Sequence, residues 1–318
     1  MTEGISRRHA ASLIVAGLTL PWAGGTASAA DPATIRIGML PLEATCVAYY
    51  AKDYGYFDKA GLNVVIEVNP SSLAVASAVV SGTYDIGYAT ISTLASAHVK
   101  GLPFVIIAPA GIITPGLVIG GIVAPLRSSI RTAKDLNGKT FAVSGLNTLA
   151  EYQPRAWVDK HGGDATTMRF IEMPLPEIVE ALDAGRVDAG YLTEPFLSVG
   201  TKRNVVRMLA TGNDALAPRY LASAWYTNSA WAEAHADIIT RFVAAMAEAG
   251  RWANANPAKV VPIVAARLKL DPTLVGAAMR TTFTDKLVDA QIQPWIDVTS
   301  KYAKFVPFPA TDLIYKAR

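Results

Sequence analysis

Polar side chains gather at four places in the sequence where a predicted strand ends and the next helix begins. These exits lie at residues 41–45, 90–93, 144–148 and 193–195. Open α/β sheets bind ligands beyond the carboxyl ends of their strands, where the following helices present N-terminal N–H groups. Hydroxyl and amide groups at such exits suit a small polar or anionic solute without an opposing Lys or Arg. The candidate ligand-binding residues are therefore Glu43, Thr45, Thr90, Ser92, Asn147, Thr148 and Glu194.

Each of these residues also has a structural interpretation. Hydroxyls at the start of a helix often only cap that helix. The pair Glu194-Pro195 leaves two interpretations open. Its carboxylate can accept hydrogen bonds from an amine or a heterocycle, or it can bond across the connection between two halves of the protein.

Other kinds of site find little support in the sequence. Cys46 is the single cysteine, so no internal disulfide is expected, and the four histidines lack the close spacing of most zinc sites. We therefore expect no metal and no cofactor. The formal charge of +3 comes without any stripe of Lys and Arg, so nucleic acid is not an expected partner. Residues 137–140 imitate the end of a phosphate-binding loop, but they precede a strand instead of following one.

The segment that leads to Glu194 repeats an earlier segment of the chain. Residues 78–90 (AVVSGTYDIGYAT) and 181–193 (ALDAGRVDAGYLT) share the same residue at six positions, among them Gly82 with Gly185, Asp85 with Asp188 and Gly87 with Gly190. The first glycine of each segment is expected to end a helix with positive φ. The aspartate is expected to bond backbone N–H groups at the turn into a strand. The second glycine is expected to allow close packing.

The elements around the repeat form two similar α/β halves. Strand-like residues 34–40 precede a helical pattern and a second strand after Gly61, and residues 139–145 begin the same series again. The helix that follows, from about residue 149, is expected to break near Pro154 or to start late. We predict a first lobe from residues 31–123, a second lobe from 124–216, and a return to the first lobe with C-terminal helices over 217–318. Two crossings between the lobes imply a hinge with a cleft.

The first 30 residues have the pattern of a cleaved export signal. Arg7 and Arg8 precede an apolar run over residues 10–20, and small residues lead to a predicted cleavage near Ala29 and Ala30. Ordinary secretion and the twin-arginine route both remain open, and an uncleaved anchor is the alternative. The mature protein is expected in a bacterial periplasm.

At this point the chain resembles a known family. The segments YYAKDYGYFDKAGLNVVIE, VVSGTYDIGYAT, TAKDLNGKTFAV, EYQPRAWVDKHGGD and AGRVDAGYLTEPF look like the periplasmic binding proteins of ABC importers in the sulfonate, taurine, nitrate and thiamine-pyrimidine-precursor group. The resemblance implies an α/β, two-lobed flytrap fold with two crossovers and a solute in the cleft. It also implies an ABC permease and its ATPase as partners, and a protein that binds without catalysis.

The solute class is expected to be a small organic anion, sulfonate-like or an aromatic carboxylate, held by a monomer. A pyrimidine or another nitrogen heterocycle is the alternative. An enzyme on the same fold is the rival from another class, because Cys46 lies where a desulfinase keeps its nucleophile and pyrimidine synthases share the fold. No Arg-x-Gly-Gly or histidine follows in the expected place, and the cysteine-rich motif of the synthases is absent. We therefore predict that Cys46 is a buried, inert thiol.

Overall fold

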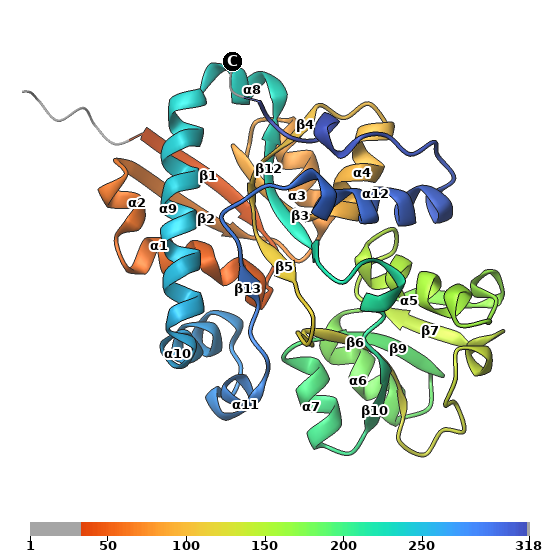
Figure 1. The fold of residues 1–318 in the computed structure, drawn as a ribbon. Helices are drawn as coiled ribbons and strands as arrows, with labels where there is room; N and C mark the ends of the chain where they lie inside the picture. Colours follow the sequence, from red (N-terminus) through yellow and green to blue (C-terminus); the bar gives the residue numbers. More distant parts are fainter. Residues whose placement is uncertain (1–32, 317–318) are drawn as a thin grey trace, which may run out of the picture. The chain divides into compact units, whose positions relative to one another are not determined.

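The computed structural model describes residues 33–316, and the predicted export signal at residues 1–30 lies outside the described residues. Two five-stranded sheets, each flanked by helices, form two lobes, and a smaller three-stranded sheet lies where the chain passes between them (Figure 1). The predicted two-lobed α/β fold with crossings between the lobes is confirmed. None of the helices in the described part of the chain combines the length and hydropathy needed to cross a bilayer.

The first lobe is built on a sheet with the strand order β2-β1-β3-β12-β4. Its strands are β1 (Ala33–Met39), β2 (Leu62–Val68), β3 (Ile86–Thr90), β4 (Phe104–Pro109) and β12 (Ser223–Asn228). Strand β1 runs parallel to β2 and β3, and β12 runs antiparallel to β3 and β4. The helices of this lobe are α1 (Val47–Asp53), α2 (Tyr56–Lys59), α3 (Ser72–Val80), α4 (Ile91–Val99), α8 (Ser229–Ala234), α9 (Ala236–Ala255), α10 (Pro257–Leu268) and α12 (Asp289–Ala303).

The second lobe has the strand order β10-β6-β9-β7-β8. Its strands are β6 (Gly120–Pro125), β7 (Thr140–Val143), β8 (Arg169–Glu172), β9 (Ala189–Thr193) and β10 (Val206–Ala210). Its helices are α5 (Leu149–Lys160), α6 (Leu175–Asp183) and α7 (Phe196–Lys202). Strand β7 runs parallel to β8 and β9, and β6 runs antiparallel to β9 and β10. Each sheet therefore begins with three parallel strands, β2-β1-β3 in the first lobe and β8-β7-β9 in the second. An antiparallel strand, β12 or β6, follows, and the fifth strand, β4 or β10, lies at the edge.

The sequence repeat occupies the same place in both sheets. Gly82 follows α3 with φ +75°, and Gly185 follows α6 with φ +68°, a backbone conformation that glycine adopts most readily. A Cβ atom on Gly87 would lie 2.6 Å from the Tyr226 ring. The predicted helix ends and the predicted close packing at Gly87 are therefore confirmed.

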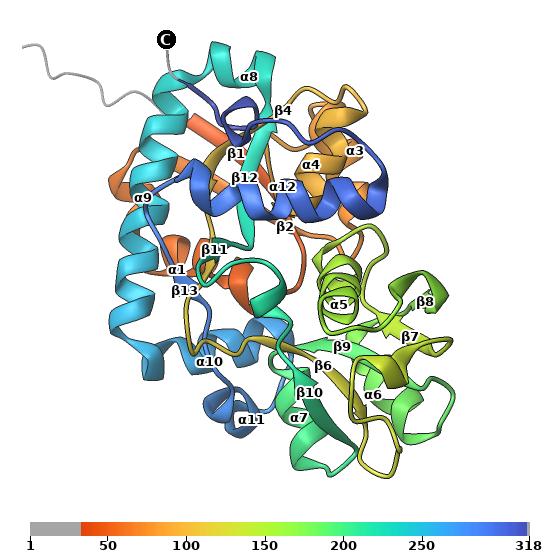
Figure 2. The same ribbon diagram turned by 45° about the vertical axis from the view of Figure 1, so that its right-hand side comes forward.

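Three short strands join the lobes. They are β5 (Gly111–Ile113), β11 (Tyr220–Leu221) and β13 (Thr282–Phe283), which pair antiparallel in the order β11-β5-β13. The chain leaves the first lobe through β5 and returns through β11, and the two crossings lie side by side in both views (Figures 1 and 2). The lobe boundary expected at residue 124 lies inside β6, so we place the boundary ahead of Gly120.

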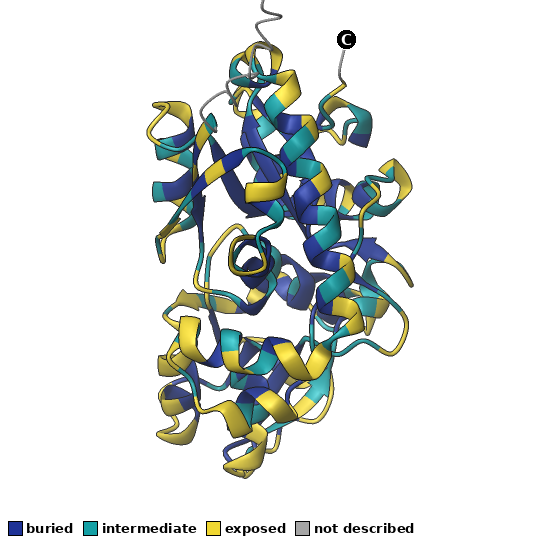
Figure 3. Ribbon diagram, turned by 90° about the vertical axis from the view of Figure 1, so that its left-hand side faces the viewer, coloured by how far each residue is buried: buried dark blue, intermediate teal, exposed yellow. Residues whose placement is uncertain are grey.

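Helix α5 corrects one expectation. It runs from Leu149 to Lys160 without interruption, although Pro154 lies inside it. The break expected at this proline is wrong. Proline removes one backbone donor, here the one that would reach the carbonyl of Ala150, and the rest of the helix is kept by its packing. Buried residues lie mainly on the strands and on the inner faces of the helices (Figure 3).

Candidate functional site

Glu43 opens the 3-10 helix η1 (Glu43–Cys46) that follows β1. Its side chain is 6% exposed, and its Oε2 atom accepts hydrogen bonds from the Thr281 N–H at 2.9 Å and from the Thr281 hydroxyl. Burial raises the pKa of Glu43, and the two bonds from Thr281 act in the opposite direction. The partner of Glu43 therefore comes from the far end of the sequence, where no local pattern marked it.

Thr45 and Cys46 are both buried, at 1% and 0% exposure. The Thr45 hydroxyl donates to the carbonyls of Leu40 and Leu42, each at 2.8 Å, so its proton is engaged within its own turn. The Cys46 thiol donates to the Leu42 carbonyl at 3.6 Å, and burial raises its pKa. A thiol that ionises with difficulty is a poor nucleophile, and the prediction of a buried thiol is confirmed.

A cluster of hydroxyls lies where β3 meets α4. Thr90 caps α4: its Oγ1 atom accepts the Thr93 N–H at 3.3 Å and lies 2.9 Å from the hydroxyls of both Ser92 and Thr93. Ser223 stands opposite Thr90 in β12 and accepts the Gly111 N–H at 3.3 Å. Thr90 therefore caps α4, as its structural interpretation predicted. Ser223 is a polar neighbour that the sequence analysis did not single out.

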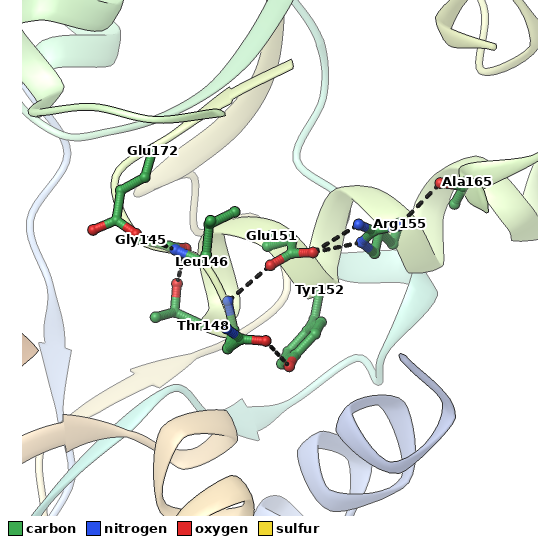
Figure 4. A network of polar contacts seen from close by, with 9 residues as sticks. Gly145, Leu146, Thr148, Glu151, Tyr152, Arg155, Ala165 and Glu172 are labelled. Carbon is green, nitrogen blue, oxygen red and sulfur yellow. Dashed lines mark hydrogen bonds and ion pairs between the residues drawn. The ribbon is translucent and has the colours of Figure 1, made fainter. Parts of the chain in front are cut away.

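The loop before α5 forms the corresponding end of the second lobe (Figure 4). Thr148 caps α5, because its Oγ1 atom accepts the Ala150 N–H at 3.2 Å and donates to the Gly145 carbonyl at 2.7 Å. Asn147 has φ +59°, and its side-chain Oδ1 atom accepts a hydrogen bond from the Tyr152 hydroxyl at 3.2 Å. Both predicted residues therefore lie at the start of α5, with their side chains bonded to their own helix and loop.

Two glutamates that the sequence analysis did not single out accept hydrogen bonds from backbone N–H groups of this loop. Glu151 accepts the Asn147 N–H at 2.8 Å, and Glu172 accepts the Leu146 N–H at 3.0 Å. Glu151 also pairs with Arg155 at 2.7 Å (Figure 4). A carboxylate is favoured at a helix N-terminus by the helix dipole. The spacing Thr-x-x-Glu over residues 148–151 is a capping-box pattern that would have pointed to Glu151.

Glu194 lies where β9 ends and α7 begins. Its Oε1 atom accepts the Ser198 hydroxyl at 2.9 Å, its Oε2 atom accepts the Ser198 N–H at 3.1 Å, and its own N–H donates to the Ile119 carbonyl at 2.9 Å. Burial raises the pKa of Glu194, and the bonds from Ser198 lower it. The neighbouring Thr193 hydroxyl is buried and has no partner among the described residues.

The structure brings some of the predicted residues together and keeps others apart. The negative charge of Glu194 helps to raise the pKa of Glu43, although the two side chains belong to different lobes. Within residues 33–316, no hydrogen bond connects the hydroxyl cluster at Thr90 with the loop at Asn147. Residues 33–316 contain no group of His, Cys, Asp and Glu side chains arranged to hold a metal ion.

Comparisons with known proteins agree with this architecture. The chain is 24% identical over 203 residues to a putative ABC transporter periplasmic binding protein of Brachyspira hyodysenteriae, covering 59% of the chain and 58% of that protein. It is 24% identical over 189 residues to a putative aliphatic sulfonates-binding protein of Bacillus subtilis, covering 57% of the chain and 55% of that protein. The matches thus span little more than half the length of these two relatives.

Among solved structures, the periplasmic aliphatic sulphonate binding protein of Escherichia coli has the same fold. The two structures superpose with a TM-score of 0.76 at 19% identity, over 90% of this chain and 93% of that one. The family profile described as NMT1/THI5 like matches residues 45–260, well over half of the sequence. The protein therefore belongs to the NMT1/THI5-like family.

Proposed function

We propose that this protein is the periplasmic solute-binding component of an ABC importer, acting as a monomer that delivers a small molecule to a permease and its ATPase. The observation that carries the proposal is the placement of polar loops at the carboxyl ends of β1 and β3 in one lobe and of β7 and β9 in the other. A solute that contacts both lobes favours the arrangement in which they close on it. The names of the relatives support the same function, and a pKa raised by burial argues against Cys46 as a catalytic nucleophile.

The polar groups at these loops favour a solute that donates hydrogen bonds, such as a pyrimidine, another nitrogen heterocycle or an amine. Glu43 and Glu194 present carboxylates, which only accept hydrogen bonds when ionised. The N–H groups of Leu146 and Asn147, which would suit an anion, already bond Glu172 and Glu151. This preference reverses the order of the two solute classes expected from sequence.

A small organic anion, sulfonate-like or an aromatic carboxylate, is the second candidate. Its support comes from the sulfonate-binding names of a relative and a structural neighbour and from the hydroxyls of Thr90 and Ser92. Ser92 is fully buried, and its hydroxyl lies 2.9 Å from that of Thr90, so the two hydroxyls form a hydrogen-bonded pair. An anion at this place would be compatible with the two glutamates in their protonated form, which burial favours by raising the pKa of both side chains.

A screen of melting temperature over alkyl sulfonates, aromatic carboxylates, pyrimidines and amines tests the function. At a hundred times its dissociation constant, a true solute stabilises the native state by about 2.7 kcal/mol. The same solute should reduce the radius of gyration in small-angle scattering. If no compound of these classes raised the melting temperature or made the protein more compact, the proposed function would be wrong.

Glu194→Gln separates the two solute classes. A heterocycle or amine that donates to the carboxylate should bind far more weakly to this variant, whereas an anion should bind as well or better. Glu180→Gln is the matched control, because Glu180 lies in the same lobe and pairs with Arg203 at the surface. Strong loss of an anionic solute in Glu194→Gln would contradict the assignment of polarity.

The export signal adds a test of location. We propose that the protein recovered from a periplasm begins near Ala30, because the small residues at 27 and 29 suit signal peptidase. Intact mass measures this directly. A mature protein that still carried Arg7 and Arg8 would contradict it.

A further inference from the structure

One face of α5, a helix of the second lobe, packs against the first lobe. Helix α5 contacts α12 and α4, and it lies beneath α12 in both views (Figures 1 and 2). Tyr152 on this face is 2% exposed, and it belongs to a buried hydrophobic cluster whose other buried members come from the first lobe and from β5 and β11. Its ring stacks on that of Tyr302 in α12, with the ring centroids 6.2 Å apart and the planes at 14°. The first lobe therefore buries a side chain that the second lobe supplies.

Asp159 lies on the same face of α5, about two turns after Tyr152, and divides its carboxylate oxygens between the lobes. Its Oδ1 atom accepts the Ala165 N–H of its own lobe at 2.9 Å. Its Oδ2 atom accepts hydrogen bonds from the Lys301 ammonium at 2.7 Å and from the Tyr302 hydroxyl at 2.9 Å, both on α12. The bond from Ala165 holds the carboxylate in place for α12, and hydrogen bonds to a charged acceptor are stronger than neutral ones. Tyr302 thus contacts α5 twice, through its ring and through its hydroxyl.

The pair of Asp159 with Lys301 joins the two lobes. Within residues 33–316, every other ion pair joins two residues of the same lobe. The Lys301 side chain is 59% exposed, so solvent weakens its attraction to Asp159. We therefore assign most of the contact to the hydroxyl bond of Tyr302 and to the packing of Tyr152. A hollow of about 330 Å³ between α5 and α12 borders these side chains, so the helices can separate without leaving a sealed void.

Helix α5 also connects this face with the polar loop at its start. The Tyr152 hydroxyl donates to Oδ1 of Asn147, one of the predicted solute contacts, at 3.2 Å. The next residue, Gln153, is 1% exposed and donates to the Thr211 carbonyl at 2.9 Å and to Oδ1 of Asn213 at 2.8 Å, in the segment that returns to the first lobe. Helix α4 begins at the exit of β3, α5 begins at the exit of β7, and α12 packs on α4. Moving these two exits apart therefore pulls α5 away from α12.

We propose that Tyr152, Asp159, Lys301 and Tyr302 form an interlobe clasp that favours the closed arrangement of the lobes before any solute binds. They act as positioning residues, and their effect on binding rests on the function proposed above. A solute that contacts both lobes binds with an apparent affinity proportional to the fraction of protein already in the competent arrangement. The clasp therefore raises the affinity for any such solute, and it leaves the choice of solute to the polar loops.

The test uses the protein without solute, so that its failure and failure of the proposed function are distinguishable. Spin labels are attached to the variants Ser77→Cys in α3 of the first lobe and Glu177→Cys in α6 of the second, combined in one chain with Cys46→Ala. Both label sites are exposed and lie outside the clasp. Double electron–electron resonance then gives the distribution of distances between the lobes.

Two substitutions weaken the clasp without removing a large side chain. Asp159→Asn keeps an acceptor for the Ala165 N–H and removes the charge, whereas Tyr302→Phe keeps the ring that stacks on Tyr152 and removes the donor. We expect each to shift the distribution to longer distances. Because both remove the same hydrogen bond, the shift in the double variant should be smaller than the two single shifts added together.

Asp214→Asn is the matched control, because it removes the same charge from the same lobe. Asp214 pairs with His161 at 2.7 Å and with Lys160 at 3.7 Å, both in its own lobe, so its distances should equal those of the wild type. Unchanged or shorter distances in Asp159→Asn and Tyr302→Phe, or an equal shift in the control, would overturn the proposal. If Asp159→Asn does not fold, Tyr302→Phe decides alone, and a distribution equal to that of the wild type would overturn the proposal.

Discussion

The side-chain carboxylate of Asp188 accepts a hydrogen bond from the backbone N–H of Thr140 at 2.8 Å, and the Asp188 N–H donates to the Thr140 carbonyl at 3.0 Å. The same two bonds join Asp85 to Arg36 in the first lobe, at 2.7 and 2.8 Å. Each aspartate thus links the start of one strand to a parallel neighbour by two hydrogen bonds: β3 to β1 in the first lobe and β9 to β7 in the second. The sequence predicted bonds from these aspartates to backbone N–H groups, and the structure shows that the N–H belongs to the neighbouring strand.

Replacing either aspartate should destabilise its own lobe. Asp188→Ala leaves the Thr140 N–H without its acceptor, which costs about 1–3 kcal/mol when the donor is buried. Urea unfolding measures the loss, and Asp85→Ala should give a similar value. Asp183→Ala is the control, because Asp183 pairs with Arg127 at the surface and should change stability by less than about 1 kcal/mol. A loss in Asp188→Ala no larger than in the control would contradict this role.

Glu43 should make the stability of the protein depend on pH. Its pKa is raised above the unfolded value of 4.5, so the folded protein binds more protons than the unfolded chain between 4.5 and the folded pKa. Stability therefore falls as pH rises through that window. Glu43→Gln has no carboxyl group to titrate and so lacks this pH-dependent loss of stability. The free energy of unfolding of the variant, relative to that of the wild type, should therefore increase as pH rises.

Thermal unfolding at several pH values checks this expectation for Glu43. Glu248→Gln is a suitable control, since Glu248 forms an exposed pair with Lys59 at 3.3 Å. The free-energy difference between control and wild type should stay nearly constant with pH. If the difference for Glu43→Gln were equally constant, Glu43 would not titrate as its burial requires.

Cys46 should behave as a packing residue. Its thiol is fully buried, so an aromatic disulfide reagent should react with it only as fast as the protein unfolds. Cys46→Ala should leave the affinity for the solute within about threefold, or under roughly 1 kcal/mol. Rapid labelling of the folded protein, or a sulfinate or pyrimidine conversion that disappears with Cys46→Ala, would support the enzyme instead.

Thr148 allows its capping role and its proposed ligand contact to be separated. Thr148→Ala should cost about 0.5–2 kcal/mol of stability through the lost cap, and about 1–3 kcal/mol of binding if a solute group is left unpaired. Thr148→Asn should restore the cap, because asparagine is also a good N-cap residue. Calorimetric binding and urea unfolding of both variants give the two values. If Thr148→Ala bound the solute with full affinity, Thr148 would only cap α5 and would not contact the solute.

Local sequence signals were enough to predict the central strands and helices of both lobes and their repetition, apart from the break wrongly expected at Pro154 of α5. Gly82 and Gly185, with the aspartates three residues later, mark helix ends and strand starts through backbone preferences that act within a few residues. Hydrophobic periodicity and the order of the elements then lead to two α/β lobes. The same local signals placed Thr90 and Thr148 at the starts of their helices.

Which distant polar groups come into contact depends on the tertiary structure. Glu43 and Thr281 are 238 residues apart in sequence, and Glu172 reaches Leu146 from the end of a different strand. Such contacts depend on how the chain crosses between sheets, and a hydrogen bond over this separation leaves no trace in local propensity or periodicity. The charge balance of the site therefore arises from the packing of distant segments, because burial and neighbouring charges exist only in the folded chain.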